Sequence, residues 1–336
     1  MPKTQSARVA FSPFADERLQ EELSAKLQVL EQLIAQSLQS QTPLVPLIGS
    51  HILEGGGKRI RPLLLILSAR ASGYEGPADV LLASLIEWIH AATLLHDDVL
   101  DEADLRRETP TVRRIWGNRV SVSMGDYAYF HAVTGLIRLS NSALAPCLLH
   151  ACQSMALGEL MQLEQGADPK SESIYLRIVE HKTGALMAAT CKAGGIVAEA
   201  SESDCLALFR FGLALGVAFQ LMDDALDYVA PPGFGKQQGH DLRQGLVTLP
   251  LLHLQGHCGD SEREQLNDFL LTRARPDETF EWVTALLARS GSIEYTIALA
   301  HYYRDVAKQH LAHFKGSIYK EALLALADLL LKHEES

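Results

Sequence analysis

Two acidic triplets of identical spacing carry the strongest chemical signal in the sequence. Their members, each set arranged as D-D-x-x-D, are Asp97, Asp98 and Asp101 in the first and Asp223, Asp224 and Asp227 in the second. Residues four apart stand about 40° apart around a helix, so the first and last aspartates of each triplet project together. Like charges at this spacing repel, and no Lys or Arg lies within four residues of either triplet. The triplets therefore need an external cation.

Clustered carboxylate oxygens of this kind suit Mg²⁺, which keeps some of its waters and commonly completes its shell with substrate phosphates. The residues before the triplets, 92–95 and 219–222, are mostly apolar, which places the carboxylates at the rim of a core or cavity. Mn²⁺ would fit the same oxygen ligands. The alternative is a pair of solvated helix ends that are acidic by coincidence.

A glycine-rich segment followed by cations could hold an anion. Three glycines at 55–57 precede Lys58, Arg59 and Arg61, and Pro62 is suited to open the next helix. The segment is not a Walker A loop, because Arg59 stands where Ser or Thr is needed. The alternative is a helix that ends in glycine and is followed by solvated basic residues.

Further candidate anion binders flank the first triplet. Arg106 and Arg107 follow Asp101 by one to two helical turns, and His90 precedes Asp97 by seven residues on nearly the same helical face. A lone histidine on an apolar helix is more often a core residue, so His90 is a candidate only in this company.

Two more cations interrupt otherwise apolar or glycine-rich stretches. Lys182, Thr183 and Gly184 break an alanine-rich helical pattern, where the ammonium could bind phosphate and the hydroxyl could offer an oxygen. Lys236 lies in a loop over 230–245 that is crowded with Gly and Pro, a candidate lid over a bound anion. The alternative for Lys236 is a solvated loop lysine.

Helical periodicity dominates the elements that must position these residues. Apolar residues three and four apart predict helices over 18–38, 78–99, 143–165, 173–193, 205–228 and 319–331. The apolar face of the first predicted helix comprises Leu19, Leu23, Leu27, Leu30 and Leu33. The only alternating stretch, 120–124, is short and runs into a helical pattern. We therefore predict an all-α fold, in which every helix of a single domain shares one core.

The composition excludes several classes of protein. Of 336 residues, 47% are hydrophobic and 21% are charged, which permits a sizeable core and excludes a disordered chain. The net charge of −11 disfavours a nucleic-acid partner or an anionic membrane surface. No run of about 18 apolar residues predicts a transmembrane segment, and residues 1–23 lack the apolar stretch of a secretory signal. Five cysteines without CxxC spacing are expected as reduced thiols. We expect a cytoplasmic protein.

Five segments, in this order along the chain, resemble the polyprenyl synthetase family of trans-isoprenyl diphosphate synthases. They are GGKRIRP at 56–62, HAATLLHDDVLDEADLRR at 90–107, KTG at 182–184, FQLMDDALDY at 219–228 and GKQQGHDLRQGLVTLP at 235–250. The resemblance implies a homodimer of all-α subunits, each a single-domain helical bundle over residues 1–336 around a deep central cavity. Residues 1–20 are expected to form a flexible N-terminal extension.

The resemblance also implies a prenyltransferase of isoprenoid biosynthesis that condenses isopentenyl diphosphate with an allylic prenyl diphosphate. Mg²⁺ would be held by Asp97, Asp101 and Asp223, supported by Asp98, Asp224 and Asp227. The allylic diphosphate would be bound by Arg106, Lys182 and Lys236, and isopentenyl diphosphate by Lys58, Arg61, His90 and Arg107. Thr183 and Gln220 would stabilise an allylic carbocation through their oxygen dipoles.

Product length and activity follow from smaller details of the resemblance. Ala92 and Thr93, five and four residues before the first triplet, are small, so a growing chain could pass and we expect a long all-trans product of octaprenyl type. The sequence departs from the family at Glu108, where Gly is usual, and at Leu246, where Lys is usual. Alternatives are a short-chain farnesyl or geranylgeranyl diphosphate synthase, a non-catalytic regulatory subunit, a terpene cyclase, which has no use for GGKRIRP, and a metal-dependent phosphohydrolase.

Overall fold

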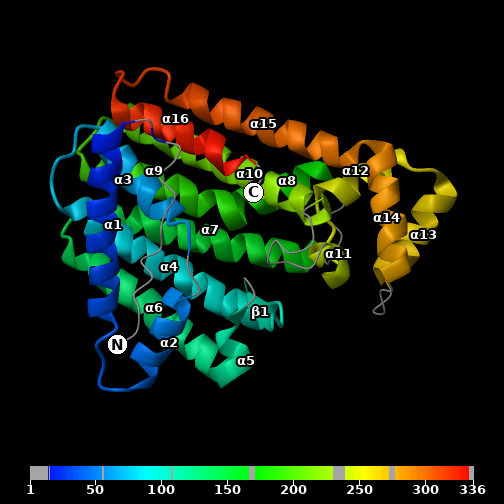
Figure 1. The fold of residues 1–336 in the computed structure, drawn as a ribbon, viewed down its shortest axis with the longest axis horizontal. Helices are drawn as coiled ribbons and strands as arrows, with labels where there is room; N and C mark the ends of the chain where they lie inside the picture. The colour runs from blue at the N-terminus through cyan, green and yellow to red at the C-terminus, as the bar shows by residue number, and fades with distance from the viewer. Residues whose placement is uncertain are drawn as a thin grey trace. The chain divides into compact units, whose positions relative to one another are not determined.

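The computed structural model describes residues 14, 16–54, 57–106, 109–165, 171–229, 239–271 and 277–332. Within these ranges the regular structure is helical except for a two-residue antiparallel pairing of β1 (Leu105–Arg106) with β2 (Thr109–Pro110). The predicted all-α class is confirmed (Figure 1).

Contacts divide the chain into two compact units. The first comprises Met1–His150, Ala189–Phe209 and Leu311–Leu329, and the second comprises Ala151–Ala188, Arg210–His310 and Leu330–Ser336. A single domain around a deep central cavity stays a prediction. The predicted N-terminal extension overlaps a helix, because α1 begins at Glu17; residues 1–13 and 15 lie outside the described residues.

The first unit is built mainly from the first six helices of the chain and from the last one. They are α1 (Glu17–Ser37), α2 (Leu44–Glu54), α3 (Ile60–Ala71), α4 (Ala78–Leu100), α5 (Val112–Trp116), α6 (Asn118–Arg138) and α16 (Ile318–Leu330). The helices α4 and α6 pack side by side, and α1 crosses α4 (Figure 1). Residues 62–69 of α3 are all buried, as expected of a helix surrounded by others.

The helix α1 confirms the predicted apolar face with one difference. Its buried residues are Leu19, Leu23, Leu27, Leu30 and Ile34. Ile34 takes the place expected for Leu33, because a spacing of four continues from Leu30 along the same stripe. The helix starts where the Asp16 carboxylate accepts the N–H of Leu19 at 3.0 Å, an ordinary N-terminal cap.

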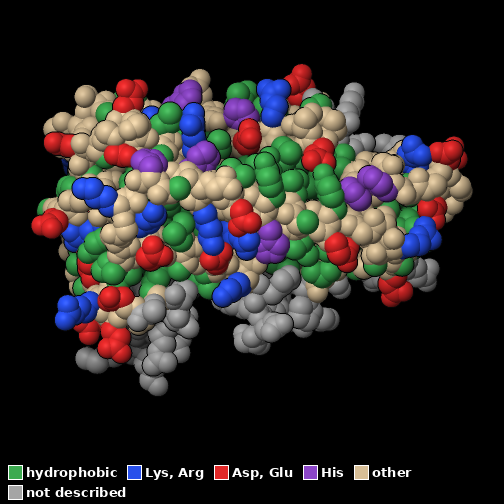
Figure 2. All heavy atoms as spheres, turned by 90° about the horizontal axis from the view of Figure 1, so that it is seen from above, with side chains coloured by type: hydrophobic (Ala, Val, Ile, Leu, Met, Phe, Trp, Pro, Cys, Tyr) green, Lys and Arg blue, Asp and Glu red, His purple; other side chains and the backbone are tan. Residues whose placement is uncertain are grey.

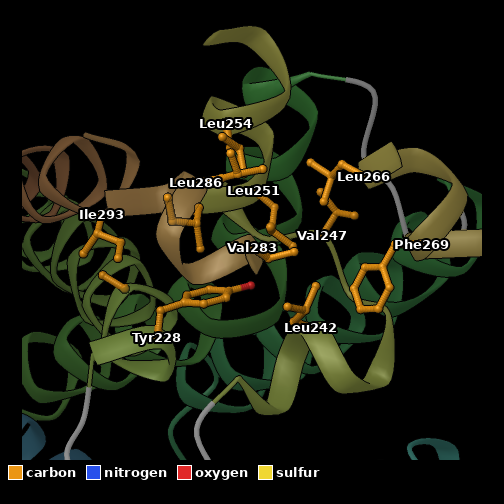
Figure 3. Close-up of a cluster of buried hydrophobic side chains, with 12 residues drawn as sticks. Tyr228, Leu242, Val247, Leu251, Leu254, Leu266, Phe269, Val283, Leu286 and Ile293 are labelled. Carbon is orange, nitrogen blue, oxygen red and sulfur yellow. The ribbon is translucent and has the colours of Figure 1, made fainter. Parts of the chain in front are cut away.

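The second unit contains the C-terminal helices and parts of three long ones. The helices α7 (Leu144–Gln165), α9 (Ala185–Val197) and α10 (Glu202–Val229) each begin in one unit and end in the other. The remaining helices are α8 (Glu172–Val179), α11 (His240–Gln244), α12 (Leu249–His257), α13 (Asp260–Leu271), α14 (Asp277–Ser290) and α15 (Ser292–His310). Figure 3 shows one of the cores of this unit, in which the ring of Tyr228 points among side chains of α11, α12 and α14.

Two elements differ from the sequence-based expectation. The helix predicted over 173–193 is divided by η1 (Glu180–Gly184), a π-helical turn between α8 and α9, and such turns are frequent at functional sites. The loop predicted over 230–245 contains the short helix α11, and residues 230–238 lie outside the described residues.

Two of the described helices have the length and apolar composition of a membrane span, which is weak evidence for one. The helices α4 and α10 are long and apolar enough to cross a bilayer, but most of each apolar stretch is buried inside the structure, as in any core helix. The face in Figure 2 shows acidic, basic and apolar side chains interspersed, without a field of a single charge.

A close helix contact in the first unit allows a stability test. A methyl group added at Gly194 of α9 would lie 2.7 Å from the carbonyl oxygen of Leu65 on α3, whereas one added at Gly256 of α12 would meet nothing within 4 Å. We expect Gly194→Ala to lower the free energy of unfolding by about 1–3 kcal/mol. Gly256→Ala is the control and should raise it by about 0.5–1 kcal/mol. Urea denaturation measures both, and a neutral Gly194→Ala would contradict the contact.

Candidate active site

The first aspartate triplet closes α4. Asp97 and Asp98 lie in its last turn, and Asp101 caps its C-terminus with an N–H that donates to the carbonyl oxygen of Asp97 at 2.8 Å. Asp98 is buried, Asp97 is half-buried and Asp101 is exposed. The three carboxylates therefore differ in their access to solvent and to a ligand.

Asp98 forms an ion pair with an arginine of the same chain. Its Oδ1 accepts a hydrogen bond from Nε of Arg106 at 2.9 Å and also lies 2.9 Å from Nη2 of that residue. Burial raises the pKa of Asp98 above its ordinary value, although the guanidinium groups of Arg106 and Arg113 oppose the shift. The triplet is thus relieved in part by an arginine that follows it in the sequence by more than four residues.

The glycine and cation segment leads into α3 beside α4. Arg59 pairs with Glu31 of α1 at 2.7 Å and with Glu87 of α4 at 2.6 Å. Lys58 and Arg61 flank Arg59 in the chain, and His90 follows Glu87 by one helical turn. The structure therefore brings the segments bearing Lys58, Arg61 and His90 to the same part of the first unit. Arg107 and Glu108 lie outside the described residues.

The second triplet lies within α10, and its middle carboxylate is buried. Asp224 accepts a hydrogen bond from Nε2 of Gln220 at 2.8 Å and a short one from the hydroxyl of Tyr175. Burial raises the pKa of Asp224 to about 7, and its two hydrogen-bond donors act in the opposite direction. Asp223 is half-buried.

Asp227, the last member, holds the start of α11. Its carboxylate accepts the backbone N–H groups of His240 at 3.1 Å and Asp241 at 3.0 Å, and its carbonyl oxygen accepts that of Gly239 at 2.7 Å. The next residue, Tyr228, is anchored in the core drawn in Figure 3. The motif thus fixes the C-terminal side of the glycine-rich segment. Lys236 lies outside the described residues.

The π-helical turn η1 presents Lys182 and Thr183. The ammonium of Lys182 lies 2.6 Å from Oε2 of Glu159 and donates to Oε1 of Gln162 at 2.8 Å. The hydroxyl of Thr183 donates to Oε1 of Gln220 at 2.8 Å. Hydrogen bonds thus connect Thr183, through Gln220 and Asp224, to Tyr175.

Two glycines bring η1 against α10. A methyl group added at Gly216 would lie 2.7 Å from the Cα of Gly184, and one added at Gly184 would lie 2.9 Å from Leu213. The two backbones are therefore in direct contact, about two helical turns before Asp223 on α10. Of the predicted site residues in the second unit, Lys182, Thr183, Gln220 and Asp224 share this one neighbourhood.

Some residues of the site escaped the sequence analysis. Tyr175, Glu159 and Gln162 lie far from their partners in sequence and carry no local signal. Glu87 could have been noticed, because it lies three residues before His90, the spacing of neighbouring side chains on a helix surface. Among the described residues, no group of three or more His, Cys, Asp or Glu side chains is placed to hold a metal ion by itself.

The helical fold, the two carboxylate triplets and the cationic segments define an enzyme of the isoprenoid synthase class. The chain belongs to the polyprenyl synthetase family, whose model matches residues 43–287. This confirms the identification from the motifs and makes the chain an enzyme that transfers prenyl groups.

Curated relatives match over most of their length. The chain is 38% identical over 305 residues to an octaprenyl diphosphate synthase of Haemophilus influenzae, covering 90% of this chain and 92% of the relative. It is 38% identical over 303 residues to the Escherichia coli octaprenyl diphosphate synthase, covering 90% of this chain and 94% of the relative.

Solved structures of polyprenyl synthases also resemble this chain in fold. A polyprenyl synthase of Caulobacter crescentus, complexed with calcium and isoprenyl diphosphate, superposes with a TM-score of 0.90 at 36% identity, over 95% of this chain and 98% of that one. A decaprenyl diphosphate synthase of Rhodobacter capsulatus superposes with a TM-score of 0.89 at 36% identity, over 94% and 98%.

The contrast between Asp223 and Asp227 yields a prediction. Asp227→Ala removes two acceptors of backbone N–H groups, so the free energy of unfolding should fall by about 1–2 kcal/mol. Asp223→Ala leaves both of these acceptors in place and removes a charge that repels Asp224, so it should lower stability less than Asp227→Ala does, while turnover falls. Denaturation and prenyltransferase assays on both variants check this. Equal destabilisation by the two substitutions would contradict the assigned capping role.

Proposed function

We propose that this protein condenses isopentenyl diphosphate with an allylic prenyl diphosphate and repeats the step to give a long-chain all-trans polyprenyl diphosphate. The proposal rests on the family and on the polar groups of the site. Its finer parts are the product length, the use of Mg²⁺, the residue roles and the assembly.

One observation carries the proposal. In the first unit, Glu87 binds the segment that bears Lys58 and Arg61, and His90 and Asp97 follow along α4. His90 and Asp97 are seven residues apart, about 10 Å along the helix. The cationic segment at the start of α3 is thus joined to α4, the helix that also carries His90 and the first carboxylates, and two diphosphate substrates require both kinds of group. A terpene cyclase or a hydrolase, with one diphosphate, has no use for the first set.

The carboxylates fit a divalent cation by their chemistry. Oxygen donors suit Mg²⁺, and the three aspartates that are not fully buried, Asp97, Asp101 and Asp223, are those expected to hold it. The relative complexed with calcium and isoprenyl diphosphate supports a divalent metal. When bound, the metal would neutralise charge that develops on the departing diphosphate. Mn²⁺ would serve the same ligands.

The other residues bind the substrates and stabilise charge. Arg106, Lys182 and Lys236 are proposed to bind the allylic diphosphate, and Lys58, Arg61, His90 and Arg107 to bind isopentenyl diphosphate. Departure of pyrophosphate leaves an allylic carbocation, which the double bond of isopentenyl diphosphate attacks; the released pyrophosphate takes the proton. The hydroxyl oxygen of Thr183 and the amide oxygen of Gln220 would stabilise the positive charge, held in place by their mutual hydrogen bond.

Supporting aspartates have separate tasks in this proposal. Arg106 binds Asp98, and both Tyr175 and Gln220 donate to Asp224. The start of α11 binds Asp227. Asp224 orders Gln220 and Asp227 orders α11, so these residues would support the metal ligands indirectly.

We extend the proposal to a homodimer in the cytoplasm. Apolar side chains are exposed on α6 (Phe130 at 63%, Ile137 at 67%) and on α7 (Leu160 at 63%, Leu163 at 62%), and exposed apolar faces of this kind mark interaction sites. All five cysteines are free thiols, which suits a reducing compartment.

Metal dependence and the first triplet are tested together. Asp97→Ala should lower turnover by several orders of magnitude, with an unchanged circular dichroism spectrum, because the metal ligand is lost while the helix is kept. Chelation of wild-type protein should abolish turnover, and added Mg²⁺ should restore it. Near-normal rates for Asp97→Ala would refute the role of this residue.

Product length is tested by sizing the products. Wild-type protein incubated with labelled isopentenyl diphosphate, farnesyl diphosphate and Mg²⁺ should give a ladder that ends at one long chain by chromatography and mass spectrometry. Ala92→Phe places a ring at a buried position of α4, five residues before the first triplet, and should shorten the product. An unchanged length would place the growing chain elsewhere, and no elongation at all would favour a partner-dependent or regulatory subunit.

A further inference from the structure

Ion pairs join α1 to the two helices that carry the cationic segment and the first triplet. Arg70 at the end of α3 lies 2.8 Å from Glu22, and Lys26 of α1 lies 2.7 Å from the buried Asp79 of α4. At the other end of α3, Arg59 contacts both Glu31 of α1 and Glu87 of α4.

Arg59 makes the most extensive of these contacts. Its Nε and Nη2 donate to the two carboxylate oxygens of Glu31 at 2.7 and 3.2 Å, and its Nη1 donates to Oε2 of Glu87 at 2.6 Å. The Arg59 side chain is 13% exposed and that of Glu87 is 11% exposed. Arg59 therefore has its charge matched twice by protein carboxylates, which leaves it poorly suited to bind a substrate phosphate.

Burial would lower the pKa of Arg59, but the carboxylates of Glu87 and Glu31 outweigh it and raise the pKa above the ordinary value. The guanidinium therefore stays charged, as both ion pairs require.

The backbone at Arg59 adopts a conformation that arginine seldom takes. Its φ is 48° and its ψ is 37°, in the left-handed region that favours glycine. It is also the N-cap of α3, where its carbonyl oxygen accepts the N–H of Leu63 at 3.1 Å. A strained residue of this kind persists only where surrounding contacts determine it, and here the ion pairs do so.

The contact links the cationic segment to a defined point on α4. Lys58 precedes the strained residue and Arg61 lies in the first turn of α3, so both depend on the direction that the chain takes at Arg59. Glu87 lies one turn before His90 on α4. A change in the Arg59 contact would move Lys58 and Arg61 relative to His90.

We propose that Arg59 is a positioning residue, which binds no substrate but fixes Lys58 and Arg61 relative to His90 by joining the start of α3 to Glu31 and Glu87. This inference rests on the proposed function, in which those three residues bind isopentenyl diphosphate. Loss of the Arg59 contacts with Glu31 and Glu87 should weaken the binding of isopentenyl diphosphate selectively. Binding of the allylic diphosphate should change less, because the aspartate triplet lies further along α4.

Two substitutions separate the side chain from the backbone. Arg59→Met removes the guanidinium and keeps the strain, whereas Arg59→Gly removes the guanidinium and also the cost of the left-handed conformation. Both should raise the KM for isopentenyl diphosphate by about 10- to 100-fold, as small misplacements of binding groups do, with less than a threefold change in the KM for the allylic diphosphate. Arg59→Lys, which can keep one ion pair, should give an intermediate value.

Arg70→Met is the matched control. It removes an ion pair of similar burial between the same two helices, α1 and α3, at the far end of α3. It should lower Tm by a similar amount to Arg59→Met while leaving both KM values unchanged. Glu87→Gln keeps the shape of the partner, neutralises its charge, and should repeat the selective effect of Arg59→Met.

Steady-state kinetics with each substrate varied, thermal unfolding, and calorimetric binding of isopentenyl diphosphate alone complete the test. Selective weakening in Arg59→Met, Arg59→Gly and Glu87→Gln supports the proposal. A wild-type KM in Arg59→Gly would show that only the backbone matters, and equal effects in Arg70→Met would show a general loss of stability; either result overturns it. If wild-type protein elongates no primer, the proposed function fails instead, a result distinct from unchanged kinetics in an active variant.

Discussion

Repulsion among carboxylates is the constraint on which the site depends. Six aspartates cluster in two triplets, one at the end of α4 and one within α10, and each buried carboxylate must find a partner or lose its charge. The structure meets this in different ways: Arg106 binds Asp98, neutral donors surround Asp224, and the start of α11 binds Asp227. The most deeply buried carboxylates are thus engaged by protein groups, and the most exposed, Asp101, lies at a helix end. The motif therefore combines buried carboxylates that bind protein groups with others that are more accessible to solvent.

The cationic segment obeys the same rule, with buried positive charges that need carboxylate partners. Arg59, the most constrained of its cations, is matched by two carboxylates, whereas Lys58 is exposed. In both motifs a residue in the middle of the sequence pattern maintains the geometry.

Much of the fold was predictable because helical periodicity is local. The spacing of Leu19, Leu23, Leu27 and Leu30 predicted α1, and the long helices α4, α7 and α10 lie close to their expected bounds. The π-helical turn at η1 was not predicted, because an added residue in a helix leaves an apolar pattern on either side that still looks continuous.

The site was predictable only in part, for a related reason. Motif spacing identified the aspartates, Lys182 and Thr183, but the partners that orient them come from distant segments. Tyr175 lies 49 residues from Asp224, and Glu31 lies 28 residues from Arg59. Periodicity does not encode such pairs. The role of Arg59 could not be inferred from the surrounding sequence, because the same pattern of glycines and cations occurs whether the cation binds a phosphate or another side chain.

The contact between Gly184 and Gly216 has a consequence for how this protein can vary. Where two helices touch through side chains, each change of residue size shifts their spacing, and relatives drift apart by such increments. Where they touch through bare backbone, there is no side chain whose size could change. The spacing between η1 and α10 is therefore set by the backbone, so substitutions elsewhere in the core should leave the distance between Thr183 and Gln220 nearly the same.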